Sequence, residues 1–153
     1  LPFSQGLTFV AADFLCPGSK FILTLRDPDK WVESYIKYYR KDLGIEDDFT
    51  NEETFRDKLL YLEKGYMHRV MRQMLVEDVG GRPQVRWDLA FDRDFLKAAF
   101  QRHNLTVRRH FAQRPRDLLE IDVAAEPDTG RLLRFLGRED HLAQPFPHAN
   151  KRT

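Results

Sequence analysis

The segment from residue 20 to residue 34 constrains the fold of this 153-residue chain more than any other. Residues 21–25 form an uncharged run of apolar and β-branched side chains, which predicts a short strand buried on both faces. The run ends at Arg26. Asp27 then suits the N-cap of a helix and Pro28 its first position, where the N–H that proline lacks would have no partner. The segment therefore predicts a strand, a tight turn and a helix.

The helix after this turn is also predicted by aromatic side chains at helical spacing, namely Trp31, Tyr35 and Tyr39. Gly44 is typical of a helix C-terminus. Arg26 is thus expected at the carboxyl end of a strand, where open α/β sheets bind ligands, and the hydroxyl of Ser34 is expected on the helix. The alternative is a structural role, in which Arg26 forms an ion pair with Asp27 or Asp29.

The rest of the chain predicts a second strand and further helices. They are a buried strand over residues 117–123, a helix from Glu126-Pro127 to Gly137, a long amphipathic helix over residues 51–78, and a helix that runs from its N-cap Asp92 to Phe111. Residues 8–12 fit either a short strand or a helical turn. Pro17-Gly18 predicts a turn into the first strand.

Two sets of residues resemble the bacterial-type sulfotransferase family, whose members transfer the sulfuryl group of 3′-phosphoadenosine 5′-phosphosulfate. Residues 20–34 resemble the segment that binds the 3′-phosphate of this donor. The second set resembles the C-terminal half of the family and comprises His103-Asn104 to Val107, Phe111, Arg114-Pro115, residues 117–123, Phe135-Leu136-Gly137 and residues 146–150. The resemblance implies an α/β fold of the P-loop-NTPase-like type, with three layers in which helices flank a parallel sheet. It also implies a small-molecule acceptor with a hydroxyl or an amine.

The resemblance further implies site residues. Arg26 and Ser34 fall on the positions that clamp the 3′-phosphate, and a basic segment late in the chain, here Lys151 and Arg152, also reaches that phosphate. No residue of this sequence matches the family's acceptor-activating base, and the glycine-rich loop that holds the phosphosulfate is absent from residues 1–153. We therefore expect a single domain that is the C-terminal portion of a longer sulfotransferase. The alternative is a catalytically inactive protein that begins at Leu1.

Composition excludes several other classes of protein. A hydrophobic content of 42% suits one globular domain, and a net charge of +1 predicts no bulk attraction to nucleic acid or to a membrane. The sequence contains no apolar stretch near the ~20 residues that span a bilayer. Its single cysteine, Cys16, excludes an internal disulfide and predicts a reducing compartment, which we take to be the cytoplasm. His103 and His110 share a helix face but lack further ligands, so no metal is expected.

A second hypothesis is a non-catalytic binding module. The helix after Asp92 and the residues beyond it carry a basic face, formed by Arg102, Arg108, Arg109, Arg114 and Arg116. Such a face could hold a nucleotide, a nucleic acid or an acidic partner, or it could simply be solvated and balanced by acids elsewhere. Salt dependence separates this hypothesis from a preformed phosphate site, because non-specific binding of polyanions weakens steeply as salt is added.

Overall fold

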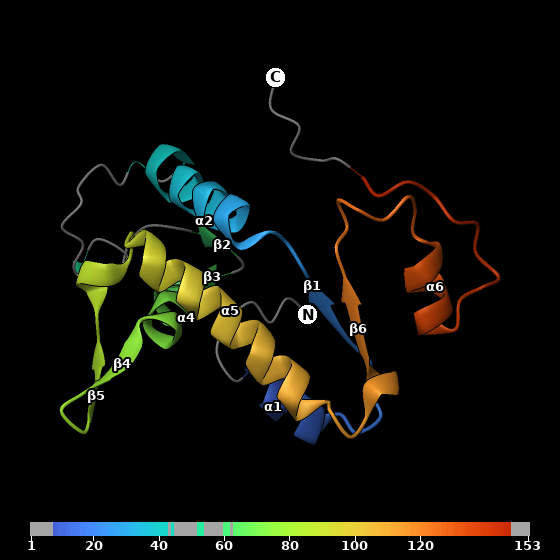
Figure 1. Ribbon diagram of the computed structural model, residues 1–153, viewed down its shortest axis with the longest axis horizontal. Coiled ribbons are helices and arrows are strands. Elements are labelled where there is room, and N and C mark those ends of the chain that lie inside the picture. Colours follow the sequence, from blue (N-terminus) through green and yellow to red (C-terminus); the bar gives the residue numbers. More distant parts are fainter. Residues whose placement is uncertain (1–7, 43, 45–51, 54–59, 62, 148–153) are drawn as a thin grey trace.

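The computed structural model describes residues 8–42, 44, 52–53, 60–61 and 63–147 (Figure 1). In chain order the α-helices are α1 (Thr8–Leu15), α2 (Pro28–Lys37), α4 (Tyr66–Met74), α5 (Arg93–His110) and α6 (Gly130–Leu136). The strands are β1 (Phe21–Thr24), β2 (Leu60–Tyr61), β3 (Glu63–Lys64), β4 (Val76–Val79), β5 (Arg82–Val85) and β6 (Leu118–Ile121). A π-helix (Tyr38–Asp42) continues α2, and two 3₁₀ helices (Trp87–Leu89 and Pro115–Asp117) precede α5 and β6.

The two predicted strands, β1 and β6, form a parallel pair. Phe21 pairs with Leu118 and Thr24 with Ile121, and the N–H of Leu25 donates to the carbonyl of Ile121 at 2.8 Å. Parallel neighbours need a long crossover connection, which the helices between them supply. The α/β class expected from the sequence is therefore confirmed.

The prediction that β1 is buried on both faces is wrong. Leu23 is buried, with 7% of its surface exposed, whereas Ile22 on the opposite face is 45% exposed. Within the described residues β1 has β6 as its single neighbour in the sheet. Ile22 faces two cavities instead of a packed layer.

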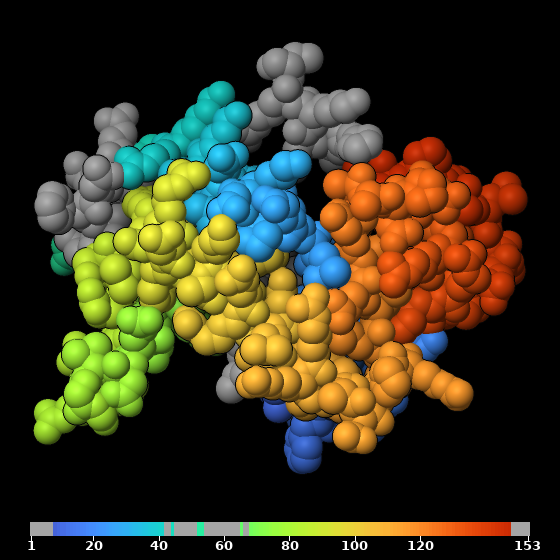
Figure 2. Space-filling model, viewed as in Figure 1, coloured from blue at the N-terminus to red at the C-terminus, as the bar shows by residue number. Residues whose placement is uncertain are grey.

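Both predicted N-caps are confirmed. The Asp27 carboxylate accepts from the N–H of Lys30 at 2.9 Å, and the Asp92 carboxylate accepts from the N–H of Phe95 at 2.7 Å. The helices that they begin, α2 and α5, pack side by side, so that their surfaces adjoin in the space-filling view (blue and yellow in Figure 2). Their contact forms one core cluster with α4, centred on Val32, Met71, Met74, Leu75, Leu96 and Ala99.

A second core cluster lies beside β1. The buried side chains of Phe9, Leu23, Val107 and Phe111 join α1, β1 and the last turns of α5. Residues 8–12, which fitted a strand or a helical turn, belong to helix α1. Because α5 contributes to both clusters, it connects the two halves of the core.

The helix predicted over residues 51–78 is confirmed only in part: residues 52–53 and α4 are helical, whereas β2, β3 and β4 are strands. Gly65 precedes α4 with a positive φ of 80°. The residues after α4 form the β4–β5 hairpin, which projects at one end of the molecule in Figure 1, opposite α6. Valines suit these strands, and Gly80-Gly81 adopts the positive φ that their tight turn requires. Residues 51, 54–59 and 62 lie outside the described residues.

The start predicted for the last helix is also wrong. Residues after β6 form a turn, in which the N–H groups of Ala125 and Glu126 donate to the carbonyl of Asp122. The helix begins only at Gly130, after Thr129 has exchanged two hydrogen bonds with Gln144. Its predicted end at Gly137, which has φ of 65°, is confirmed.

Candidate ligand site at the carboxyl end of β1

Among the described residues, no acidic side chain forms an ion pair with Arg26. It lies two residues beyond Thr24, the last residue of β1, and is exposed. Within the described residues the structural alternative is wrong, because the two expected acidic partners are engaged elsewhere. Asp27 caps α2, and Asp29 binds the ammonium of Lys97 at 2.7 and 2.8 Å. The described part of the chain supplies no ion pair to Arg26, so its guanidinium is available to an anion.

Three other residues are predicted to bind the 3′-phosphate, namely Ser34, Lys151 and Arg152. Ser34 lies on α2, the helix that follows Arg26, and its side chain is exposed. The two residues therefore belong to one strand–turn–helix unit, as predicted. Lys151 and Arg152 lie outside the described residues.

A cavity of about 450 Å³ opens at the same end of the sheet. It is lined by β1 and the residues that follow it, by one residue after β6, and by side chains of α2 and α5, namely Ile22 to Arg26, Trp31, Phe100, His103, Asn104 and Val123. Its size lies within the range of small-molecule sites, and its position matches the rule that ligands of α/β sheets bind beyond the carboxyl ends of the strands.

The electrostatics of this cavity favour an anionic or neutral ligand. None of the described residues that line it is acidic, whereas Arg26 is cationic. Burial lowers the pKa of His103, so its imidazole is neutral at pH 7. Asn104 is buried, with 7% of its surface exposed. The sequence could have singled out Asn104, since its polar side chain interrupts the apolar stripe of α5 between Phe100 and Val107.

A second cavity, of about 380 Å³, lies toward the amino end of β1. Its walls are mostly apolar and include Phe9, Phe21 and Ile22, and His103 borders both cavities. The nearby ammonium of Lys20 lies over the ring of Phe135 and donates to the Phe135 carbonyl. Its charge is therefore partly engaged, and Arg26 remains the better anion ligand.

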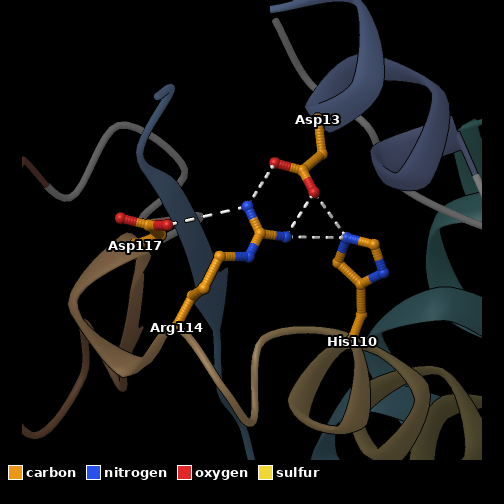
Figure 3. A network of polar contacts seen from close by, with 4 residues as sticks. All are labelled: Asp13, His110, Arg114 and Asp117. Atoms are coloured by element: carbon orange, nitrogen blue, oxygen red, sulfur yellow. Dashed lines mark hydrogen bonds and ion pairs between the residues drawn. The ribbon is translucent and has the colours of Figure 1, made fainter. Parts of the chain in front are cut away.

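A polar network joins α1, the end of α5 and the turn before β6 (Figure 3). The carboxylate of Asp13 lies 2.7 Å from Nε2 of His110 and accepts two hydrogen bonds from Arg114, one of them at 3.0 Å. Arg114 also lies 3.6 Å from Asp117. Hydrogen bonds from Arg114 and then His110 lower the pKa of Asp13 to about 2. With its acceptors occupied, this carboxylate serves as a clamp between elements and not as a base.

The basic face proposed for a binding module is partly neutralised. Arg108 binds Glu120 through Nε and a terminal nitrogen, at 2.8 and 2.6 Å, and Arg114 binds Asp13. Over the described residues, no group of three or more histidine, cysteine, aspartate or glutamate side chains is placed to hold a metal. The same part of the chain has no helix that is both long and apolar enough to cross a membrane.

Comparison with known families matches residues 9–153 to a family described as a sulfotransferase domain. The matched stretch contains β1, α2, α5 and β6, and hence every element that lines the cavity beside Arg26. Comparison with curated proteins finds no match, and neither does comparison with solved structures.

Proposed function

The chain belongs to the sulfotransferase-domain family, and on that premise we propose that its donor is 3′-phosphoadenosine 5′-phosphosulfate and its acceptor a hydroxyl or an amine of a small molecule. The observation that carries this proposal is the guanidinium of Arg26, which lies at the carboxyl end of β1 and has no ion pair within the described residues. Its acidic neighbours are held by other groups, so binding of an anion costs no existing ion pair.

Arg26 and Ser34 would hold the 3′-phosphate. A guanidinium matches two phosphate oxygens through parallel N–H donors, and a serine hydroxyl adds one more hydrogen bond. We include Lys151 and Arg152 as further cationic ligands. With the donor so anchored, a bond forms from the acceptor oxygen or nitrogen to sulfur as the bond from sulfur to the bridging phosphate oxygen breaks. Adenosine 3′,5′-bisphosphate leaves, and the proton of the acceptor is released to solvent. The role of these residues is positioning, because they bind the end of the donor that does not react.

Two observations support the proposed domain organisation and the proposed compartment. The two core clusters share α5, which supports a single domain over residues 1–153. Cys16 is a free, exposed thiol, which suits a reducing compartment such as the cytoplasm. The binding-module hypothesis is less favoured, because two of the arginines on which it depends already have carboxylate partners.

Calorimetry on Arg26→Ala tests the donor site. Loss of a charge-assisted, bidentate contact costs about 1.5–3 kcal/mol, so affinity for adenosine 3′,5′-bisphosphate should fall about 10- to 150-fold. Affinity for adenosine 5′-phosphate, which lacks the 3′-phosphate, should change little.

Arg109→Ala is the matched control, since Arg109 is exposed on α5 and does not line the cavity. This variant should bind both nucleotides as the parent protein does. Equal losses for the two nucleotides in Arg26→Ala would show that Arg26 does not recognise the 3′-phosphate. A loss confined to Arg109→Ala would favour the basic-face hypothesis instead.

A further inference from the structure

Asn104 is the buried polar residue of the described chain, and the proposed function gives it no role. It lies in the middle of α5, where 7% of its surface is exposed. Its backbone is part of the helix, but its side-chain amide forms no hydrogen bond with any of the described residues. Burial of an amide without a partner is unfavourable, and packing alone would favour an apolar side chain at this position.

Asn104 borders the cavity, and its amide is not sealed in the core. Among the described residues, no side-chain nitrogen or oxygen is both fully enclosed and unpaired, and Asn104 lines the cavity at the carboxyl end of β1. A group that enters this cavity can therefore reach the amide. Arg26 lines the same space, so one ligand can meet both side chains.

The walls around Asn104 indicate the chemistry of such a ligand. Trp31 and Phe100 stack on each other with ring centroids 4.8 Å apart, and Ile22 and Leu25 add aliphatic surface. These walls suit the faces of a flat, uncharged heterocycle. A carboxamide presents one donor and one acceptor in a single plane, which complements the exocyclic amine and the neighbouring ring nitrogen of adenine.

We propose that Asn104 reads the adenine edge of the nucleotide whose 3′-phosphate Arg26 holds. Its carbonyl accepts from the exocyclic amine at C6, and its NH₂ group donates to the ring nitrogen N7. This inference rests on the proposed function, since it takes the ligand to be the sulfuryl donor. Asn104 is accordingly a specificity residue, which contacts the donor away from the reacting sulfur.

The test compares two nucleotides that differ at this edge. Inosine 3′,5′-bisphosphate carries a carbonyl at C6 where the adenosine compound carries the amine, so its O6 and N7 are both acceptors and this edge offers no donor to the Asn104 carbonyl. By calorimetry the parent protein should prefer the adenosine compound about 5- to 150-fold, the range of one bidentate base contact. In Asn104→Leu this preference should fall to near unity, and affinity for the inosine compound should change little.

Gln101→Leu is the matched control, because it removes a carboxamide from the exposed face of the same helix. It should keep the full preference for adenosine. An Asn104→Leu protein that also keeps the preference overturns the inference. If that variant does not fold, the side-chain NH₂ resonances of Asn104 in the parent protein decide: they should shift with the adenosine compound and much less with the inosine compound. Equal shifts, or none, overturn it as well.

The two proposals fail in different ways. If Arg26→Ala weakens binding of the 3′-phosphate while Asn104→Leu leaves the base preference intact, the proposed donor site stands and the role of Asn104 falls. If the 3′-phosphate adds no affinity, the proposed donor site falls. Adenosine and inosine 5′-phosphates then test Asn104 in the same way, and loss of their discrimination in Asn104→Leu supports base recognition without the 3′-phosphate.

Discussion

Replacing Asp27 with alanine removes the side chain that begins α2 directly after Arg26. Its carboxylate accepts one hydrogen bond, from the N–H of Lys30 at 2.9 Å. The site is exposed, so in the variant the N–H of Lys30 can form a hydrogen bond with water. The expected loss is therefore that of an ordinary N-cap, about 1–2 kcal/mol of the free energy of unfolding. Asp27→Asn keeps an acceptor and removes only the charge near the positive end of the helix, so it should lose about 0.3–1 kcal/mol.

Urea unfolding measures these losses as lower midpoints at an unchanged m-value. In a chain of this length, a loss of 1 kcal/mol corresponds to about 2–4 °C in the thermal midpoint. Asp92→Ala is the matched control, since Asp92 caps α5 through the N–H of Phe95 at 2.7 Å. Asp92→Ala should lose about as much free energy of unfolding as Asp27→Ala.

Two outcomes would refute this account of the turn. If Asp27→Ala unfolds at the parent midpoint while Asp92→Ala is destabilised, the Asp27 cap contributes nothing. If Asp27→Asn loses as much as Asp27→Ala even at high salt, the side-chain hydrogen bond is not the source of the stability.

Two further predictions concern the core and the clamp. In the folded chain Arg114 and His110 lower the pKa of Asp13 from 3.8 to about 2, so the stability that this carboxylate adds is present above pH 4 and is lost as the pH falls toward 2. The difference between the parent and Asp13→Asn in urea midpoint should therefore shrink over that interval, and a constant difference would argue against the clamp. Leu75→Ala should lose about 2–5 kcal/mol because Leu75 is fully buried, whereas Leu142→Ala, at a position 87% exposed, should change stability by less than about 0.5 kcal/mol in urea unfolding.

Local sequence determined the strand–turn–helix unit around Arg26. The apolar run before it, the Asp27 cap and the position of Pro28 act between residues that are at most a few positions apart. The same holds for the Asp92 cap and for the end of α6 at Gly137. Such features can be predicted from the sequence because the groups that stabilise them are close together in the chain, independently of the tertiary packing.

The apolar stripe over residues 51–78 misled the prediction for a physical reason. Apolar residues at helical spacing show that a helix is compatible with the sequence, but not that it is the conformation of lowest free energy. Gly65 adopts a positive φ before α4, and the valines of β4 find a partner strand in β5. Strand pairing therefore decides the structure after Leu75, and the stripe alone does not reveal it.

Only the tertiary structure decided which side chains remain available for a ligand. Sequence left Arg26 with two acidic neighbours, and it is Lys97, 68 positions beyond Asp29, that engages one of them. Likewise, the sequence led to no prediction of burial for Asn104, and only the packing of α5 against β1 shows that it is buried and lines the cavity beside Arg26. Ion pairing and burial depend on groups that the chain path brings together from distant positions. Local propensities therefore predicted the elements, and their packing determined which side chains line the site.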